Sequence, residues 1–188
     1  MKRLIYVFLI NIFITNYSSA LIEVDITRGN LDPLPIAVSP LHVDIKSEKY
    51  KDINVKELGE KISAIIEKNF KDTGLFNPLR KDAFVQKPDI AHLKPRFEDW
   101  RLIKAQALVT GKLLVSDEKL KVEFRLWDLA AAQEMTALAF TTTPSNWRRV
   151  AHIISDKIYE RLTGEEGYFD TRIISVSYTH LRAHETSD

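Results

Sequence analysis

Histidines that could bind a metal together with nearby ligands are few and lie far apart along the chain. His92 has Asp89 three residues before it and Glu98 six residues after it, and two or three dispersed ligands do not make a metal site. His180 and His184 have the four-residue spacing of a helical metal pair, but no helix pattern surrounds them. We therefore predict that the protein holds neither a metal nor a cofactor.

Nucleophilic catalysis has no support in the motifs. The chain has no cysteine, and it has no G-x-S-x-G turn, no H-E-x-x-H pair and no glycine-rich phosphate loop. Its acidic residues fall on predicted helix faces and in turns, where a solvated role is expected. The sequence predicts a protein that is not an enzyme. The alternative is an exported hydrolase or small-ligand-binding domain whose site has no recognisable motif.

The three tryptophans could form a platform for sugar binding. Trp100 and Trp147 lie on apolar stripes, so we expect them in the core. Trp127 lies on the polar side of an alternating strand, which predicts a contact residue.

The stretch with the clearest interaction chemistry is residues 22–27. Its apolar and polar side chains alternate strictly, which is typical of a strand with one buried face. The six predicted partner-binding residues are Ile22, Glu23, Val24, Asp25, Ile26 and Thr27. Turn residues follow, so residues 21–34 are predicted to form a free-ended strand and a hinge. Such a strand can pair with its own sheet or add to the sheet of a partner, its apolar side chains filling pockets there.

Residues 1–20 have the pattern of a signal peptide. Lys2 and Arg3 precede an apolar stretch, and small residues end at Ala20. A membrane anchor is the alternative, but the apolar stretch is too short to span a bilayer. We expect cleavage after Ala20, a periplasmic protein and no stable membrane insertion afterwards. Without Lys2 and Arg3 the formal charge falls from +1 to −1, which gives no support for nucleic-acid binding.

Two long helices and about five strands are predicted after the hinge. The first helix has apolar residues from Val55 to Phe70 on one face, with Asn54 or Asp52 as its N-cap and Gly74 after its end. The second begins at Ser145 and ends at Gly164, and a short helix covers residues 97–103. Strands are expected at residues 36–38, 105–115 with a break at Gly111, 120–127 and 135–142. A short edge strand or turn is expected at 76–79, a loop at 81–95 and a four-residue turn at 116–119. The fold class is α/β (α+β), a two-layer domain with both long helices packed on one face of a mixed sheet.

Several of these segments carry a resemblance to a known family. Residues 35–38, residues 74–79, the helix around Trp100 and residues 162–164 are similar to the N-terminal domain of the TolB family. The likeness extends from about Ile22 to Ile173. Residues 35–166 would be the TolB N-terminal α/β domain, and residues 167–175 the start of a β-propeller that is truncated here.

The resemblance implies a periplasmic protein-interaction component of the Tol–Pal system. Members of the system support outer-membrane integrity and envelope constriction at cell division. In the family the N-terminal strand contacts the inner-membrane protein TolA, so residues 22–27 would face TolA, and the propeller binds the lipoprotein Pal. Residues 176–188 resemble a translated sequencing adapter and are expected to be non-native. On that expectation Pal binding is not assigned to this chain.

Overall fold

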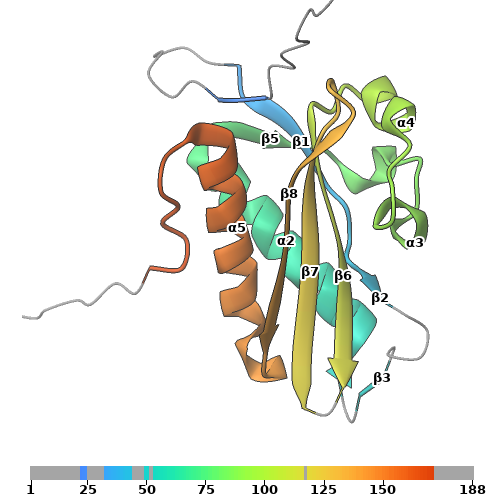
Figure 1. Cartoon of the computed structure of the whole chain (residues 1–188), viewed down its shortest axis with the longest axis vertical. Coiled ribbons are helices and arrows are strands. Elements are labelled where there is room, and N and C mark those ends of the chain that lie inside the picture. Colours follow the sequence, from blue (N-terminus) through green and yellow to red (C-terminus); the bar gives the residue numbers. More distant parts are fainter. Residues whose placement is uncertain (1–21, 25–31, 44–48, 51–52, 117, 172–188) are drawn as a thin grey trace, which may run out of the picture.

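A mixed six-stranded sheet forms the centre of the protein (Figure 1). The computed structural model describes residues 22–24, 32–43, 49–50, 53–116 and 118–171. The strands of the sheet are β1 (Leu34–Val38), β2 (His42–Val43), β5 (Phe76–Pro78), β6 (Ala107–Ser116), β7 (Lys119–Asp128) and β8 (Gln133–Thr142). Their order is β5-β1-β6-β7-β8, and β2 also pairs with β6. Two further strands, β3 (Lys49–Tyr50) and β4 (Ile53–Asn54), pair with each other.

The sheet is parallel on one side and antiparallel on the other, which confirms the predicted mixed sheet. β1 runs parallel to β5 and β6, whereas β6, β7 and β8 form an antiparallel meander. The β6–β7 register is continuous up to the pair Ser116 and Lys119, so the connection has two residues, not the predicted four. Gly111 does not break β6; a Cβ atom there would lie 2.3 Å from the Glu123 carbonyl oxygen. The glycine therefore marks a close backbone approach.

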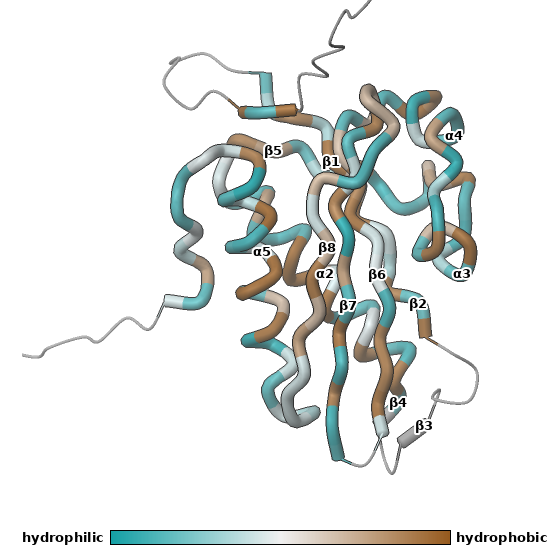
Figure 2. Tube along the Cα trace, viewed as in Figure 1, coloured by the Kyte–Doolittle hydropathy of each residue, from teal (hydrophilic) through white to brown (hydrophobic). Residues whose placement is uncertain are grey.

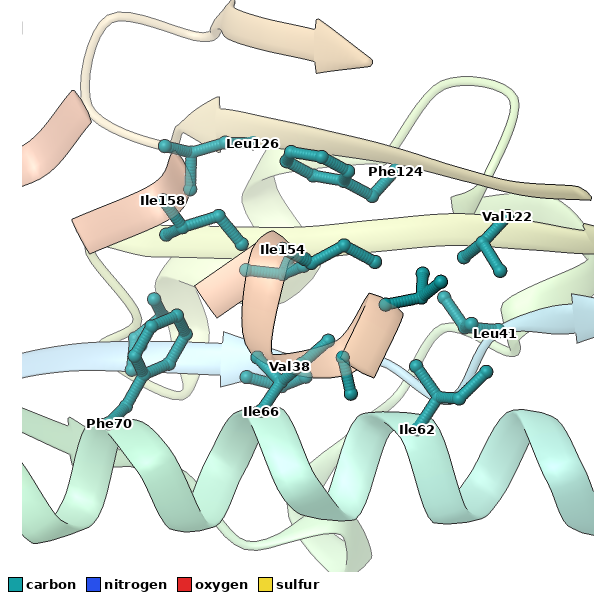
Figure 3. Packing of buried hydrophobic residues seen from close by; sticks show 14 of the residues in the cluster. Val38, Leu41, Ile62, Ile66, Phe70, Val122, Phe124, Leu126, Ile154 and Ile158 are labelled. Carbon is teal, nitrogen blue, oxygen red and sulfur yellow. The ribbon is translucent and has the colours of Figure 1, made fainter. Parts of the chain in front are cut away.

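The long helices α2 (Val55–Thr73) and α5 (Trp147–Thr163) cover one face of the sheet (Figure 1). The main core lies between these two helices and the sheet. It includes Val38, Ile66, Phe124 and Ile154, each at most 1% exposed (Figure 3). Hydropathy alternates along β7, whereas α5 carries its apolar residues in recurring groups (Figure 2). These are the two periodicities from which the sequence predicts a strand and a helix.

Most of the predicted helix ends are confirmed. Asn54 Oδ1 accepts a hydrogen bond from the Glu57 N–H at 3.2 Å, and Gly74 and Gly164 follow the two long helices with φ of 71° and 75°. The prediction of Ser145 as the cap of α5 is wrong. Pro144 starts a short 3₁₀ turn, η3 (Pro144–Asn146), so α5 begins only at Trp147.

The opposite face of the sheet is partly covered as well. The segment predicted as a loop contains η2 (Lys81–Ala83) and α3 (Pro88–Ala91), and α4 (Phe97–Leu102) follows as predicted. We call residues 80–104 the short-helix layer; α3 and α4 lie on the side of the sheet away from α2 and α5 (Figure 1). Its contact with the sheet forms a second core of Ala37, Ala91, Trp100, Ala105, Leu108, Trp127 and Leu129.

The tryptophan predictions are tested by this second core. Trp100 is 1% exposed, as expected, and its Nε1–H donates to Gln86 Oε1 at 2.9 Å. Trp127 is only 7% exposed, and its Nε1–H donates to Thr110 Oγ1 at 2.9 Å. The prediction of Trp127 as a contact residue is wrong, because the short-helix layer covers the side of β7 that strand alternation alone assigns to solvent. Trp147 is half-buried against the main core.

Candidate functional site at the N-terminal segment

Residues 22–24 lie against the ends of α5 and β7. The Val24 N–H donates to the Leu162 carbonyl oxygen at 2.6 Å, and the Ile22 N–H donates to Asp128 Oδ2 at 3.0 Å. The Val24 side chain is 9% exposed and belongs to the main core, Ile22 packs against that core, and Glu23 points to solvent. The predicted partner-binding segment therefore begins with residues that are bound to their own domain. We call the contacts of residues 22–24 with the end of α5, with Asp128 and with the main core the seat.

The end of α5 provides the first half of this seat. The last carbonyl groups of a helix have no partner within the helix, and α5 ends at Thr163 with Gly164 in the left-handed conformation. The Gly164 N–H bonds the Glu160 carbonyl, and the Val24 N–H bonds the Leu162 carbonyl. The N-terminal segment thus satisfies a helix-end acceptor that would otherwise need water.

Asp128 provides the second half. It is the last residue of β7 and is fully buried. Its Oδ1 accepts the Ala131 N–H at 2.8 Å, and its Oδ2 accepts the Ile22 N–H. Burying a carboxylate is costly unless its oxygens are hydrogen-bonded. One oxygen therefore fixes the turn after β7 while the other holds the N-terminal segment.

A groove of about 540 Å³ runs beside the seat, between the second half of α5 and β8. It is lined by Glu23, Thr136, Leu138, Lys157, Glu160, Arg161 and Gly164. Lys157 Nζ lies 2.8 Å from Glu160 Oε2, and this carboxylate raises the pKa of Lys157. β8 is an edge strand of the sheet, so its outer backbone groups can pair with an added strand.

The structure places only part of the predicted partner-binding strand. Asp25, Ile26 and Thr27 lie outside the described residues, whereas Ile22, Glu23 and Val24 are described and belong to no strand. The N–H groups of Ile22 and Val24 bond a carboxylate and a helix end, not a neighbouring strand. A partner-binding strand over residues 22–27 stays a prediction.

Metal-site geometry is absent from the part of the chain that the structure describes, where no three His, Cys, Asp or Glu residues gather. His92 stacks on His42 with ring centroids 4.0 Å apart and 4° between the planes, and its Nδ1 lies 3.0 Å from the Pro88 carbonyl oxygen. His180 and His184 lie outside the described residues.

No helix within the described ranges combines the length and the apolar composition that spanning a bilayer requires.

Two acidic residues with structural roles were missed by the sequence reasoning. Asp128 holds the N-terminal segment, and Asp156 of α5 accepts the N–H groups of Phe169 and Asp170 at 2.7 and 3.1 Å. An aspartate before a turn signals only a local side-chain-to-backbone bond, which Asp128 does make to Ala131. Nothing in the local pattern indicates Ile22 as its second partner.

The family model for the TolB amino-terminal domain matches residues 22–135, which is more than half of the chain. The chain belongs to the TolB family. The Tol-Pal system protein TolB of Pelagibacter ubique (strain HTCC1062) is 68% identical over 174 residues. That match covers 92% of this chain and 39% of the relative. The chain therefore spans well under half the length of this TolB, and the resemblance found in the sequence is confirmed.

A solved structure supports the fold. The crystal structure of TolB from Acinetobacter baumannii superimposes with a TM-score of 0.59 over 74% of this chain and 30% of that chain, at 21% sequence identity. At this identity the similarity is one of fold. The α+β architecture is thus found in a TolB of distant sequence.

Proposed function

We propose that this chain is a non-enzymatic, periplasmic interaction component of the Tol–Pal system that contacts TolA through residues 22–27. Membership of the TolB family supports the system, and the signal-peptide pattern of residues 1–20 supports the compartment. In this role the protein would support outer-membrane integrity and envelope constriction at division. We assign no Pal contact to these residues, since the family's Pal-binding propeller is not among them.

The observation that carries the proposal is the way residues 22–24 are held. Two hydrogen bonds donated by backbone N–H groups, one to a carboxylate and one to a helix-end carbonyl, make up the seat together with the Val24 side chain. Each such bond contributes about 1 kcal/mol net, and burial of a valine contributes roughly 1.5–3 kcal/mol. A partner that binds at micromolar strength gains about 8 kcal/mol, so strand addition to TolA can displace the segment from its seat.

The test measures binding of purified TolA periplasmic domain by calorimetry to two forms of the protein. One form begins at Leu21 and the other at Asn30. We expect binding by the longer form alone. Thermal unfolding of both forms must show a folded domain, because the shorter form also loses the Val24 contact with the main core.

A point variant weakens the seat while leaving the sequence of residues 22–27 unchanged. Asp128→Asn keeps Oδ1 as an acceptor for Ala131 but weakens the acceptor for the Ile22 N–H, so the seat is destabilised and TolA binding should tighten several-fold. Glu160→Gln, which alters the neighbouring groove without touching the seat, is the matched control. If both folded forms fail to bind TolA, the proposed contact is wrong. Hydrolysis of generic esters, peptides or glycans by the longer form would contradict the non-enzymatic assignment.

A further inference from the structure

Exposed apolar side chains are concentrated on the short-helix layer. Six large hydrophobic residues of the described chain are strongly exposed, and four of them lie within residues 80–104. These four are Val85 (61%), Ile90 (49%), Leu93 (70%) and Leu102 (79%). Single exposed apolar residues are ordinary on a protein surface, but four within one layer call for a partner.

The same layer is locally basic. Residues 80–104 contain seven basic and four acidic residues, a formal charge of +3, whereas the rest of the chain from Leu21 onward carries −4. The arginines are engaged in ion pairs: Arg80 with Asp82, Arg96 with Asp99 and Arg101 with Glu98.

The lysines of the layer are mostly free of ion pairs. Lys87, Lys94 and Lys104 are exposed, and none has an acidic group within ion-pair distance in the described part of the chain. Lys87 and Lys94 flank Ile90 and Leu93, and Lys104 follows Leu102 closely. Unpaired ammonium groups therefore alternate with exposed aliphatic side chains.

Leu93 lines a small groove of about 200 Å³, and residues 87–89 line part of a larger one of about 400 Å³. Val85, Ile90 and Leu102 line neither of these two grooves, which suits a broad, deformable partner better than a helix or strand held in a groove. The described segment that follows α5 lies beside this helix, on the other side of the molecule from α3 and α4 (Figure 1). The layer thus faces away from the point at which the described chain ends.

We propose that the short-helix layer docks on the surface of an anionic phospholipid bilayer. Aliphatic side chains would enter the interface between headgroups and acyl chains, and the free lysines would bind lipid phosphates with their stems along the apolar surface. Such peripheral docking needs no spanning helix. It uses residues far from the N-terminal segment and is independent of the TolA contact.

The experiment is co-sedimentation of the form that begins at Leu21 with vesicles of phosphatidylglycerol and phosphatidylethanolamine, beside vesicles of phosphatidylcholine alone. We expect binding to the anionic vesicles, several-fold weaker binding to the neutral ones, and loss of binding in high salt. The form lacks residues 1–20, whose apolar stretch would itself bind lipid.

Two variants locate the contact. Lys87→Glu with Lys94→Glu should lower anionic-vesicle binding tenfold or more, since each lysine near the surface contributes measurably, and Ile90→Ser with Leu93→Ser should lower it comparably. The matched controls are Lys119→Glu at the β6–β7 hairpin and Leu138→Ser on β8, both exposed and outside the layer; they should bind as the parent does.

Equal binding to neutral and anionic vesicles, or controls that lose as much binding as the layer variants, would overturn the proposal. So would an absence of vesicle binding. If the layer variants instead weaken the complex with the TolA domain while vesicles are never bound, the layer is a protein-binding surface.

Discussion

The two faces of the sheet are covered in different ways. Among the residues that the structure describes, α2 and α5 enclose a main core of 25 buried apolar residues on one face, and the short-helix layer encloses a second core of seven on the other. The main core is joined largely by aliphatic packing. The second is fixed by specific hydrogen bonds from Trp100, Trp127 and Arg101, whose Nε–H donates to the Leu129 carbonyl at 2.6 Å.

This difference predicts that the two cores contribute unequally to global stability. A large packed core supplies most of the hydrophobic free energy of folding, so the α2–α5 face should determine global stability. A small core with exposed aliphatic residues outside it should open locally at lower free energy. The proposed membrane contact lies on the face that contributes less to stability.

The largest expected effect is on the main core. Phe70→Ala removes a fully buried ring that packs against Phe76 with centroids 5.1 Å apart. We expect the free energy of unfolding in urea to fall by about 3–5 kcal/mol. Leu102→Ala, at an apolar site that is 79% exposed, is the control and should change it by under about 0.5 kcal/mol.

An intermediate effect is expected in the second core. Trp100→Phe removes the hydrogen bond to Gln86 Oε1, which still accepts the Arg96 N–H at 2.9 Å. The free energy of unfolding should fall by about 1–2 kcal/mol, and amide exchange should quicken in residues 80–104 more than in α2. A loss as large as that of Phe70→Ala, with exchange raised everywhere, would show that the two cores unfold as one unit.

The smallest effect on the free energy of unfolding is expected at the contact between α2 and the short-helix layer. Glu67 of α2 lies 3.1 Å from Lys81 of η2; burial raises the pKa of Glu67, and Lys81 offsets part of that rise. The folded protein therefore holds the Glu67 proton more tightly than the unfolded chain does. Between the ordinary glutamate pKa and the raised one, unfolding releases this proton, so the free energy of unfolding falls as pH rises.

Glu67→Gln removes this pH dependence. Relative to the parent, the variant should gain stability as pH rises through that window, by under about 1 kcal/mol because the loss of the Lys81 pair opposes the gain. Urea midpoints of parent and variant at several pH values between about 4 and 7, where raised carboxyl groups titrate, show whether the variant gains stability as pH rises. Glu57→Gln on the exposed side of α2 is the control. If the parent instead gains stability relative to Glu67→Gln as pH rises, the pKa of Glu67 is not raised in the folded protein.

The sequence predicts well what is decided locally. Leu120, Val122, Phe124 and Leu126 alternate and are all buried in the main core, and Asn54 caps α2 as expected. Local spacing is enough in these cases because the hydrogen bond or the buried face involves neighbours in one element.

The failure at Trp127 has its physical cause in contacts between distant segments. Alternation assigns Trp127 to a polar side, and only the separately folded short-helix layer makes that side a core. Val24 likewise has the same alternation whether its side chain enters a partner's pocket or the domain's own core. Ser145 differs, since Pro144 competes locally by starting a 3₁₀ turn.

The seat of the N-terminal segment also has a consequence for the order of events during biogenesis. Ile22 and its acceptor Asp128 are 106 residues apart, and the acceptor of Val24, at Leu162, lies further still along the chain. Contacts of such long sequence separation form late, after the intervening chain has been closed into a loop. This segment, although it lies near the start of the chain, is therefore among the last to find its place, and until α5 has folded it is open to chaperones and to the proposed partner.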